Sequence, residues 1–100
     1  MVAQKIDFPM EEITALCSRN KVRELALFGS VLRDDFRPDS DIDILVEFDQ
    51  DAEIGFMTLA KLARELSALL HRKVDLVPKT GLKPKIRGEV LARSKVLYAA

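Results

Sequence analysis

Two aspartates, Asp41 and Asp43, stand two positions apart at the start of an apolar run. If that run forms a β-strand, both side chains project from one face, with their Cα atoms roughly 6.5–7 Å apart. Two carboxylates at this spacing can reach the same cation. Mg²⁺ prefers oxygen ligands and typically keeps one or two carboxylates together with substrate phosphates and water. The pair therefore predicts a divalent-metal site that also holds the phosphates of a nucleoside triphosphate.

A third carboxylate, Asp75, lies in a short apolar run at 73–77. If this run is the neighbouring strand, the three acids can hold two metal ions, which stabilise the attacking and leaving oxygens of a displacement at phosphorus. Asp75 is then also the candidate base for the incoming hydroxyl. The sequence thus predicts catalytic and metal-binding roles for Asp41, Asp43 and Asp75.

A glycine and a serine follow the apolar run that ends at Phe28. Gly29 has no side chain, so the backbone can approach phosphate, and the N–H groups at the start of a helical segment point toward it. Ser30 adds a hydroxyl donor. Arg33 lies one helical turn after Ser30, where its planar guanidinium can meet phosphate oxygens. These three residues are predicted to bind the nucleotide.

Each of these features also has a simpler interpretation. The aspartate pair could be a solvated strand edge that discourages aggregation, and Asp75 an ordinary acid on a half-buried strand. Gly29 and Ser30 could be turn residues, and Arg33 a surface charge. The order and spacing favour a site, because Gly-Ser is followed after ten residues by Asp-Ile-Asp.

Hydrophobic periodicity predicts the elements that must position these residues. The predicted strands are 22–28, 41–48, 73–77 and 95–98, and the predicted helices are 9–20, 54–70 and one that opens at Pro84. One or two helical turns at 31–35 follow the Gly-Ser pair. This mixture indicates a small α/β fold.

The two faces of the strand at 41–48 differ in character. The face predicted to be core comprises Ile42, Ile44, Val46 and Phe48. The opposite face is predicted to carry acid and comprises Asp41, Asp43, Leu45 and Glu47. The helix at 54–70 has a broad apolar stripe, most of it core and part of it available to a partner: Phe56, Leu59, Leu62, Ala63, Leu66, Leu69 and Leu70.

Three single residues are assigned structural roles. Cys17 lies on the apolar face of the first helix and is predicted to be core. Asn20 suits a left-handed residue at the end of that helix, and His71 is expected to lie at the C-terminus of the long helix.

Composition limits the classes of protein that fit. A chain of 100 residues has room for a single domain, 1–100, and 48% hydrophobic with 32% charged residues is typical of a folded soluble protein. Sixteen basic residues balance 16 acidic ones, so direct nucleic-acid binding is not expected. The single cysteine, the lack of a signal-peptide pattern and the lack of a membrane-spanning stretch predict a cytoplasmic protein without membrane attachment.

Three segments together resemble the minimal nucleotidyltransferase family of the DNA polymerase β superfamily. They are LFGSVLR at 27–33, PDSDIDILV at 38–46 and RKVDLV at 72–77, and the resemblance extends from about Glu24 to Val96. It implies a polymerase-β-like nucleotidyltransferase fold, a small mixed β-sheet flanked by helices. It also implies that Gly29 and Ser30 hold phosphates, and that the metals are bound by Asp41 and Asp43 with Asp75 in the third acidic role.

The same resemblance implies a function. Many members of the family are antitoxins paired with a HEPN-type ribonuclease toxin, and some attach adenylyl groups from ATP to a toxin tyrosine. The expected activity is therefore Mg²⁺-dependent transfer of AMP from ATP to a hydroxyl of a HEPN-type toxin, with a tyrosine as the expected acceptor, in a hetero-oligomer.

Two alternatives stay open. One is a binding module that holds nucleotide and metal but neutralises its partner by occluding it. The departure that favours this alternative is Arg33-Asp34-Asp35, where many relatives have Arg-Gly-Glu. The other is a subunit that transfers nucleotide to a small molecule or nucleic acid supplied by another chain.

Overall fold

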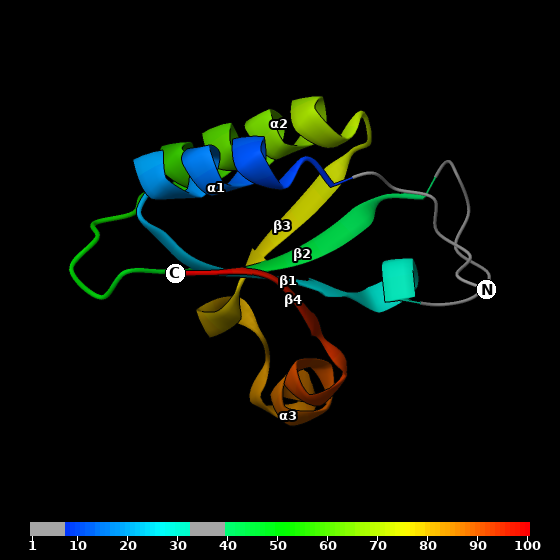
Figure 1. The fold of residues 1–100 in the computed structure, drawn as a ribbon. Helices are drawn as coiled ribbons and strands as arrows, with labels where there is room; N and C mark the ends of the chain where they lie inside the picture. Colours follow the sequence, from blue (N-terminus) through cyan, green and yellow to red (C-terminus); the bar gives the residue numbers. More distant parts are fainter. Residues whose placement is uncertain (1–7, 33–39) are drawn as a thin grey trace.

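The computed structural model describes residues 8–32 and 40–100, which form one mixed sheet with helices on both faces (Figure 1). In chain order the elements are α1 (Met10–Arg19), β1 (Val22–Phe28), the 3₁₀ helix η1 (Gly29–Leu32), β2 (Ile42–Phe48), α2 (Phe56–Leu70), β3 (Val74–Pro78), the 3₁₀ helix η2 (Lys79–Gly81), α3 (Pro84–Arg93) and β4 (Lys95–Ala99). Helices α1 and α2 lie on one face of the sheet, and α3 lies on the other. The predicted small mixed sheet flanked by helices is confirmed.

The strand order is β3-β2-β1-β4. β1 pairs antiparallel with β2 and with β4, whereas β2 and β3 are parallel and are connected through α2. A parallel pair needs such a crossover because the chain must return to the same end of the sheet. The consequence is that β2 and β3 begin at the same end of the sheet, and both carry aspartates there.

The main core fills the space between the sheet and the helices α1 and α2. Leu62, Leu66 and Leu70 recur every four residues on α2 and are buried, and Cys17 is fully buried on α1 as predicted. Phe56 belongs to the part of the stripe that is not core. Its side chain is 81% exposed because it lies in the first turn of α2.

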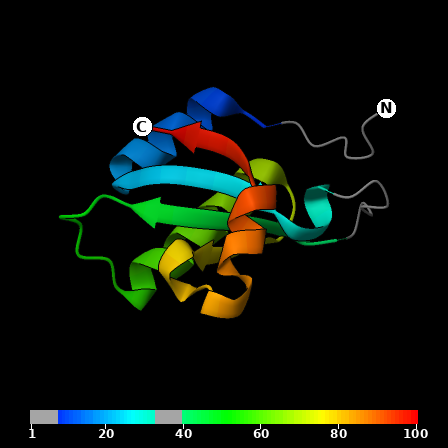
Figure 2. The same cartoon turned by 90° about the horizontal axis from the view of Figure 1, so that it is seen from below.

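The opposite face of the sheet carries a second, smaller apolar cluster. Ala26, Leu45 and Leu82 are buried there, and Val77 and Val90 pack against them. The sequence predicted that Leu45 shares the acid-bearing face of the strand at 41–48, and the structure shows that Leu45 is buried on that face. Leu82, which follows η2, and Val90, which lies in α3, pack against Leu45. The periodicity of the strand itself could not predict this cover. Figure 2 shows α3 lying across this face of the sheet.

The left-handed residue after the first helix lies one position later than predicted. Asn20 has φ −104°, and the left-handed residue is Lys21, with φ 57°. The Asn20 side chain instead donates a hydrogen bond to the Leu16 carbonyl oxygen at 2.8 Å. His71 does end α2, in a left-handed conformation.

Across residues 8–32 and 40–100, no helix has the length and apolar character needed to cross a membrane.

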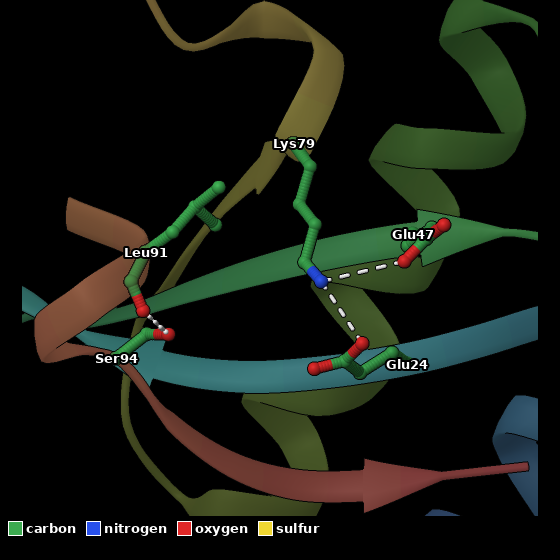
Figure 3. Close-up of polar contacts among 5 residues, drawn as sticks. All are labelled: Glu24, Glu47, Lys79, Leu91 and Ser94. Carbon is green, nitrogen blue, oxygen red and sulfur yellow. Dashed lines mark hydrogen bonds and ion pairs between the residues drawn. The ribbon is translucent and has the colours of Figure 1, made fainter. Parts of the chain in front are cut away.

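Lys79 ties η2 to the two central strands (Figure 3). Its Nζ atom lies 2.9 Å from Glu24 Oε1 and 3.3 Å from Glu47 Oε1. The two glutamates are cross-strand partners, and like charges in that position repel. Burial alone would lower the pKa of Lys79, but the hydrogen bonds and charges of Glu24 and Glu47 outweigh it and raise that pKa. Lys79 thus neutralises a repulsive pair.

Candidate active site

Gly29 forms a left-handed corner at the end of β1. Its φ angle is +74°, a region that glycine adopts without strain, and η1 begins at this residue. A Cβ atom added to Gly29 would overlap the Asp43 carboxylate, with Asp43 Cγ only 3.3 Å away. Because Gly29 has no side chain, the backbone of the corner can lie directly against Asp43. The 3₁₀ helix starts at this corner, two residues earlier than the helical turn expected at 31–35.

The strand register places Asp43 beside Asp75. Asp43 on β2 is the register partner of Phe28 on β1 and of Asp75 on β3. Neighbouring strands lie roughly 4.8 Å apart, and residues in register on parallel strands project from the same face. The two carboxylates therefore share the face of the sheet that the Gly29 corner adjoins.

Asp41 lies immediately before β2 and is exposed. Its Oδ2 atom is 4.0 Å from Lys73 Nζ, in an ion pair whose lysine side chain is 79% exposed, so solvent screens the attraction. The Arg72 guanidinium donates a hydrogen bond to the Ser40 carbonyl oxygen, and the Ile42 N–H donates to the Lys73 carbonyl oxygen at 2.9 Å. These bonds hold the entry of β2 against the entry of β3, and so position Asp41.

The pKa of Asp43 is raised above its ordinary value. Burial is the largest cause, because it disfavours the charged carboxylate, and the negative charges of Asp75 and, less strongly, Asp41 act in the same direction. A hydrogen bond from the Ser30 backbone acts in the opposite direction. The raised pKa shows that the surroundings of Asp43 favour an added positive charge, either a proton or a cation.

The carboxylates fit a metal that arrives with its substrate. In the described parts of the chain, no three His, Cys, Asp or Glu side chains are grouped closely enough to hold a metal by themselves. Mg²⁺ does not require such a cage, since it commonly takes one or two carboxylates and completes its shell with phosphate oxygens and water. Asp43 and Asp75, which repel one another, supply carboxylates of this kind.

An open pocket of about 650 Å³ adjoins the Gly29 corner. The corner and η1 form one wall, and α3 forms the other; the lining residues are Phe28, Gly29, Ser30, Leu32, Glu89, Val90 and Arg93. The sequence analysis did not single out Glu89 or Arg93. The one pattern in the sequence that pointed to Glu89 and Arg93 was their spacing of four on a weakly amphipathic helix, which places both on one helical face. Arg33, predicted to bind nucleotide, lies outside the described residues.

A phosphate chain needs hydrogen-bond donors together with positive charge, and both can be provided where the corner meets the aspartates. The start of η1 offers backbone N–H groups, and the adjoining carboxylates can recruit cations to the same phosphates. Beside them is a pocket large enough for a small organic ligand. The class of protein that this fold and site define is a nucleotidyltransferase.

Comparison with known proteins gives the family. Residues 10–97 match the nucleotidyltransferase domain family, and the chain belongs to it. One relative is the protein adenylyltransferase MntA of Thermococcus cleftensis, which is 38% identical over 90 residues, covering 82% of this chain and 89% of the relative. The family-level prediction from the sequence motifs is therefore confirmed, as is the prediction that the chain is a nucleotidyltransferase enzyme.

Solved structures show the same fold. A minimal nucleotidyltransferase structure aligns with a TM-score of 0.70 at 35% identity, covering 88% of this chain and 86% of that one. A toxin-antitoxin structure with AMP-PNP aligns with a TM-score of 0.73 at 26% identity, covering 93% and 75%. A third match, with a TM-score of 0.63 at 26% identity and coverage of 90% and 69%, is a tri-AMPylated Shewanella oneidensis HEPN toxin in complex with an MNT antitoxin.

Proposed function

We propose that this protein is an antitoxin that transfers AMP from ATP, with Mg²⁺, to a tyrosine hydroxyl of a HEPN-type toxin. The observation that carries the proposal is the position of Asp43, against the Gly29 corner on one side and in register with Asp75 on the other. The names of the similar proteins support the choice of ATP and of a toxin partner, since they include a protein adenylyltransferase, an AMP-PNP complex and an AMPylated HEPN toxin.

Each predicted site residue has a role in the proposal. Gly29 donates a backbone hydrogen bond to the phosphates, Ser30 donates from its hydroxyl, and Arg33 supplies a further phosphate contact. Asp41 and Asp43 hold the metal, with Asp75 as the third acid. When bound, one or two Mg²⁺ ions neutralise charge on the phosphates.

The transfer itself breaks one bond and forms one. The acceptor hydroxyl oxygen bonds to the α-phosphorus of ATP, and the bond from that phosphorus to the oxygen bridging the β-phosphate breaks. Pyrophosphate leaves with the bonding electron pair. Asp75, on the same face as Asp43, takes the hydroxyl proton.

A protein acceptor in the cytoplasm suits the rest of the chain. The formal net charge of zero gives no long-range attraction to a nucleic-acid acceptor. The free thiol of Cys17 is buried, and this burial raises its pKa to about 11, as expected for a core residue rather than a nucleophile. We infer that the working form is a hetero-oligomer with the toxin.

Intact-mass analysis tests the proposal. The purified protein is mixed with ATP, Mg²⁺ and the HEPN-type product of the neighbouring gene, and adenylyl increments are expected on that partner. Asp41→Asn and Asp43→Asn should abolish them. Asp51→Asn, an exposed aspartate beyond β2, is the matched control and should leave them unchanged. A stable complex of unaltered mass with the wild-type protein would instead support occlusion without catalysis.

A further inference from the structure

The pocket beside the Gly29 corner has two walls from distant parts of the sequence. One wall comes from the end of β1 and from η1, and the other from the last turns of α3. Among the described residues, the site residues predicted from the sequence lie on the first side, on β2 and β3, or at Asp41 immediately before β2. None of these predicted site residues lies on the α3 wall, although that wall faces the same space as Gly29 and Ser30.

Charge distinguishes the residues of the α3 wall. ATP carries several negative charges, and the nearby site already contains Asp41, Asp43 and Asp75, to which the pocket adds Glu89. Among the described residues that line the pocket, Arg93 is the basic one. A guanidinium presents several donors in a plane and forms strong, charge-assisted bonds to phosphate. Arg93 is therefore placed where a polyphosphate needs a cation.

The remaining lining is apolar. Phe28 and Leu32 contribute from the corner side and Val90 from α3, and all three are only partly buried by the protein itself. Ligand pockets commonly combine such apolar walls with a few polar groups that fix orientation. A nucleoside has a flat, largely apolar base joined to a charged phosphate tail, so it matches a pocket with these two kinds of wall.

We propose that α3 completes the nucleotide site, with Arg93 binding the phosphates and Val90, together with Phe28 and Leu32, contacting the nucleoside. This inference rests on the proposed function and assigns the part of the site that holds the substrate outside the aspartates. α3 has no buried residue and is attached to the sheet chiefly through Val90. Since so little packing holds it, α3 can adjust its position when a ligand fills the pocket.

Two probes separate the two halves of the site. Titration calorimetry with ATP and with inorganic tripolyphosphate, both at fixed Mg²⁺, compares the wild type with Arg93→Gln and Val90→Thr. Arg93→Gln should weaken both ligands by a factor on the order of ten, since it removes a phosphate contact. Val90→Thr keeps the side-chain shape but adds a polar group, so it should weaken ATP alone.

Lys85→Gln is the matched control. Lys85 is exposed on α3, does not line the pocket, and loses the same charge on substitution, so its affinity for ATP should equal that of the wild type. Hydrogen exchange provides a second readout, in which ATP with Mg²⁺ should slow exchange of the α3 amides from Glu89 to Arg93 in the wild type and much less in Arg93→Gln.

The outcomes distinguish this inference from the proposed function. Wild-type binding of ATP with no loss in Arg93→Gln, or an equal loss in Lys85→Gln, would overturn the role of Arg93. Loss of tripolyphosphate binding in Val90→Thr would overturn the nucleoside placement. If the wild-type protein does not bind ATP at all, the proposed function fails and this inference fails with it.

Discussion

At the scale of single residues, two properties meet at Gly29. The residue is left-handed, and it lies so close to Asp43 that a side chain has no room. Either property alone favours glycine, and together they make the corner specific to it. The close approach is also what brings the Ser30 backbone within hydrogen-bonding reach of the Asp43 carboxylate.

Gly29→Ala should therefore abolish nucleotidyl transfer and lower the free energy of unfolding by about 1–3 kcal/mol, since the strained corner must move away from Asp43. Urea denaturation and the intact-mass assay measure the two effects. Gly88→Ala is the control, because a Cβ at Gly88 meets nothing within 4 Å. In the middle of α3 this substitution should stabilise the protein by roughly 0.5–1 kcal/mol and keep activity. Equal behaviour of the two variants would contradict the argument.

The raised pKa of Asp43 predicts that this residue lowers the stability of the protein at neutral pH, although the proposed activity requires it. Its pKa is raised in the folded protein, first by burial and then by Asp75, so the folded state holds a proton more tightly than the unfolded state. As pH rises from the ordinary pKa of aspartate through this raised value, the wild type loses stability. Asp43→Asn has no such charge, and it should be more stable than the wild type at pH 7 while inactive.

That advantage should shrink as the pH falls below the ordinary pKa of aspartate, where Asp43 is protonated in both states. Urea denaturation at a series of pH values measures it. Asp51→Asn, at an exposed position, should follow the wild-type curve throughout. An Asp43→Asn variant that is less stable than the wild type at pH 7 would show that burial of the charge, together with repulsion from Asp75 and Asp41, is not the dominant effect at this site.

Much of the site could be predicted at this scale, and the reason is chemical. Acids spaced by two at the start of one strand and a glycine at the end of the strand before it have few uses, so Gly29, Asp43 and Asp75 were identifiable, and the structure brings them together. Arg93 and Glu89 were not, because a pair spaced by four on a helix is common. Only the packing of α3 over the sheet brings them to the corner.

At the scale of elements, the prediction succeeded where one face of an element is buried along its whole length. α2 and β2 have long apolar faces, and both were found with their ends within two residues. The burial of Leu45 and the exposure of Phe56 could not be predicted from their own elements, because both depend on what other elements cover. Leu45 is covered by Leu82 and Val90, whereas Phe56 has nothing packed over it and is 81% exposed.

η2 is stabilised by charge more than by apolar burial, and Lys79 is its main attachment to the central strands. Lys79→Met should lower the free energy of unfolding by roughly 1–2 kcal/mol, since the partly buried Glu24 and Glu47 then face one another without a counter-charge. Because the pKa of Lys79 is raised, its contribution is complete below the ordinary lysine pKa of 10.5 and is lost as the pH rises above that value.

Urea denaturation at neutral pH measures the effect of Lys79→Met, with Lys73→Met as the control. Lys73 is exposed, and its Nζ atom lies as far as 4.0 Å from Asp41 Oδ2, so its removal should change stability by less than about 0.5 kcal/mol. Adding Glu47→Gln to Lys79→Met should restore part of the loss, because it removes the like-charge pair. If the double variant is no more stable than Lys79→Met, cross-strand repulsion is not the cause.

At the scale of the whole molecule, the sheet separates stability from chemistry. The main core lies between the sheet and the helices α1 and α2, and α3 lies over the other face (Figures 1 and 2). The Gly29 corner, Asp43 and Asp75 adjoin that other face. A central strand such as β2 serves both sides, since Ile44 faces the core and Asp43 the site. A substitution in the main core should therefore lower the free energy of unfolding without changing the affinity of the site for nucleotide.

Leu66→Ala tests this separation, because Leu66 is fully buried on α2 and its side chain belongs to the main core. The substitution should lower the free energy of unfolding by about 2–5 kcal/mol, a large share of the 5–15 kcal/mol typical of a domain. At a temperature where the variant is folded, its affinity for ATP should match that of the wild type. Saturating ATP with Mg²⁺ should then raise its thermal midpoint, since a ligand that binds only the folded state stabilises it.

Ile44→Val, which costs only about 0.5–1.5 kcal/mol, repeats the test on β2 if Leu66→Ala does not fold. A weakened affinity for ATP in Ile44→Val would mean that the core side of β2 sets the position of Asp43, and that the two faces of the sheet are coupled.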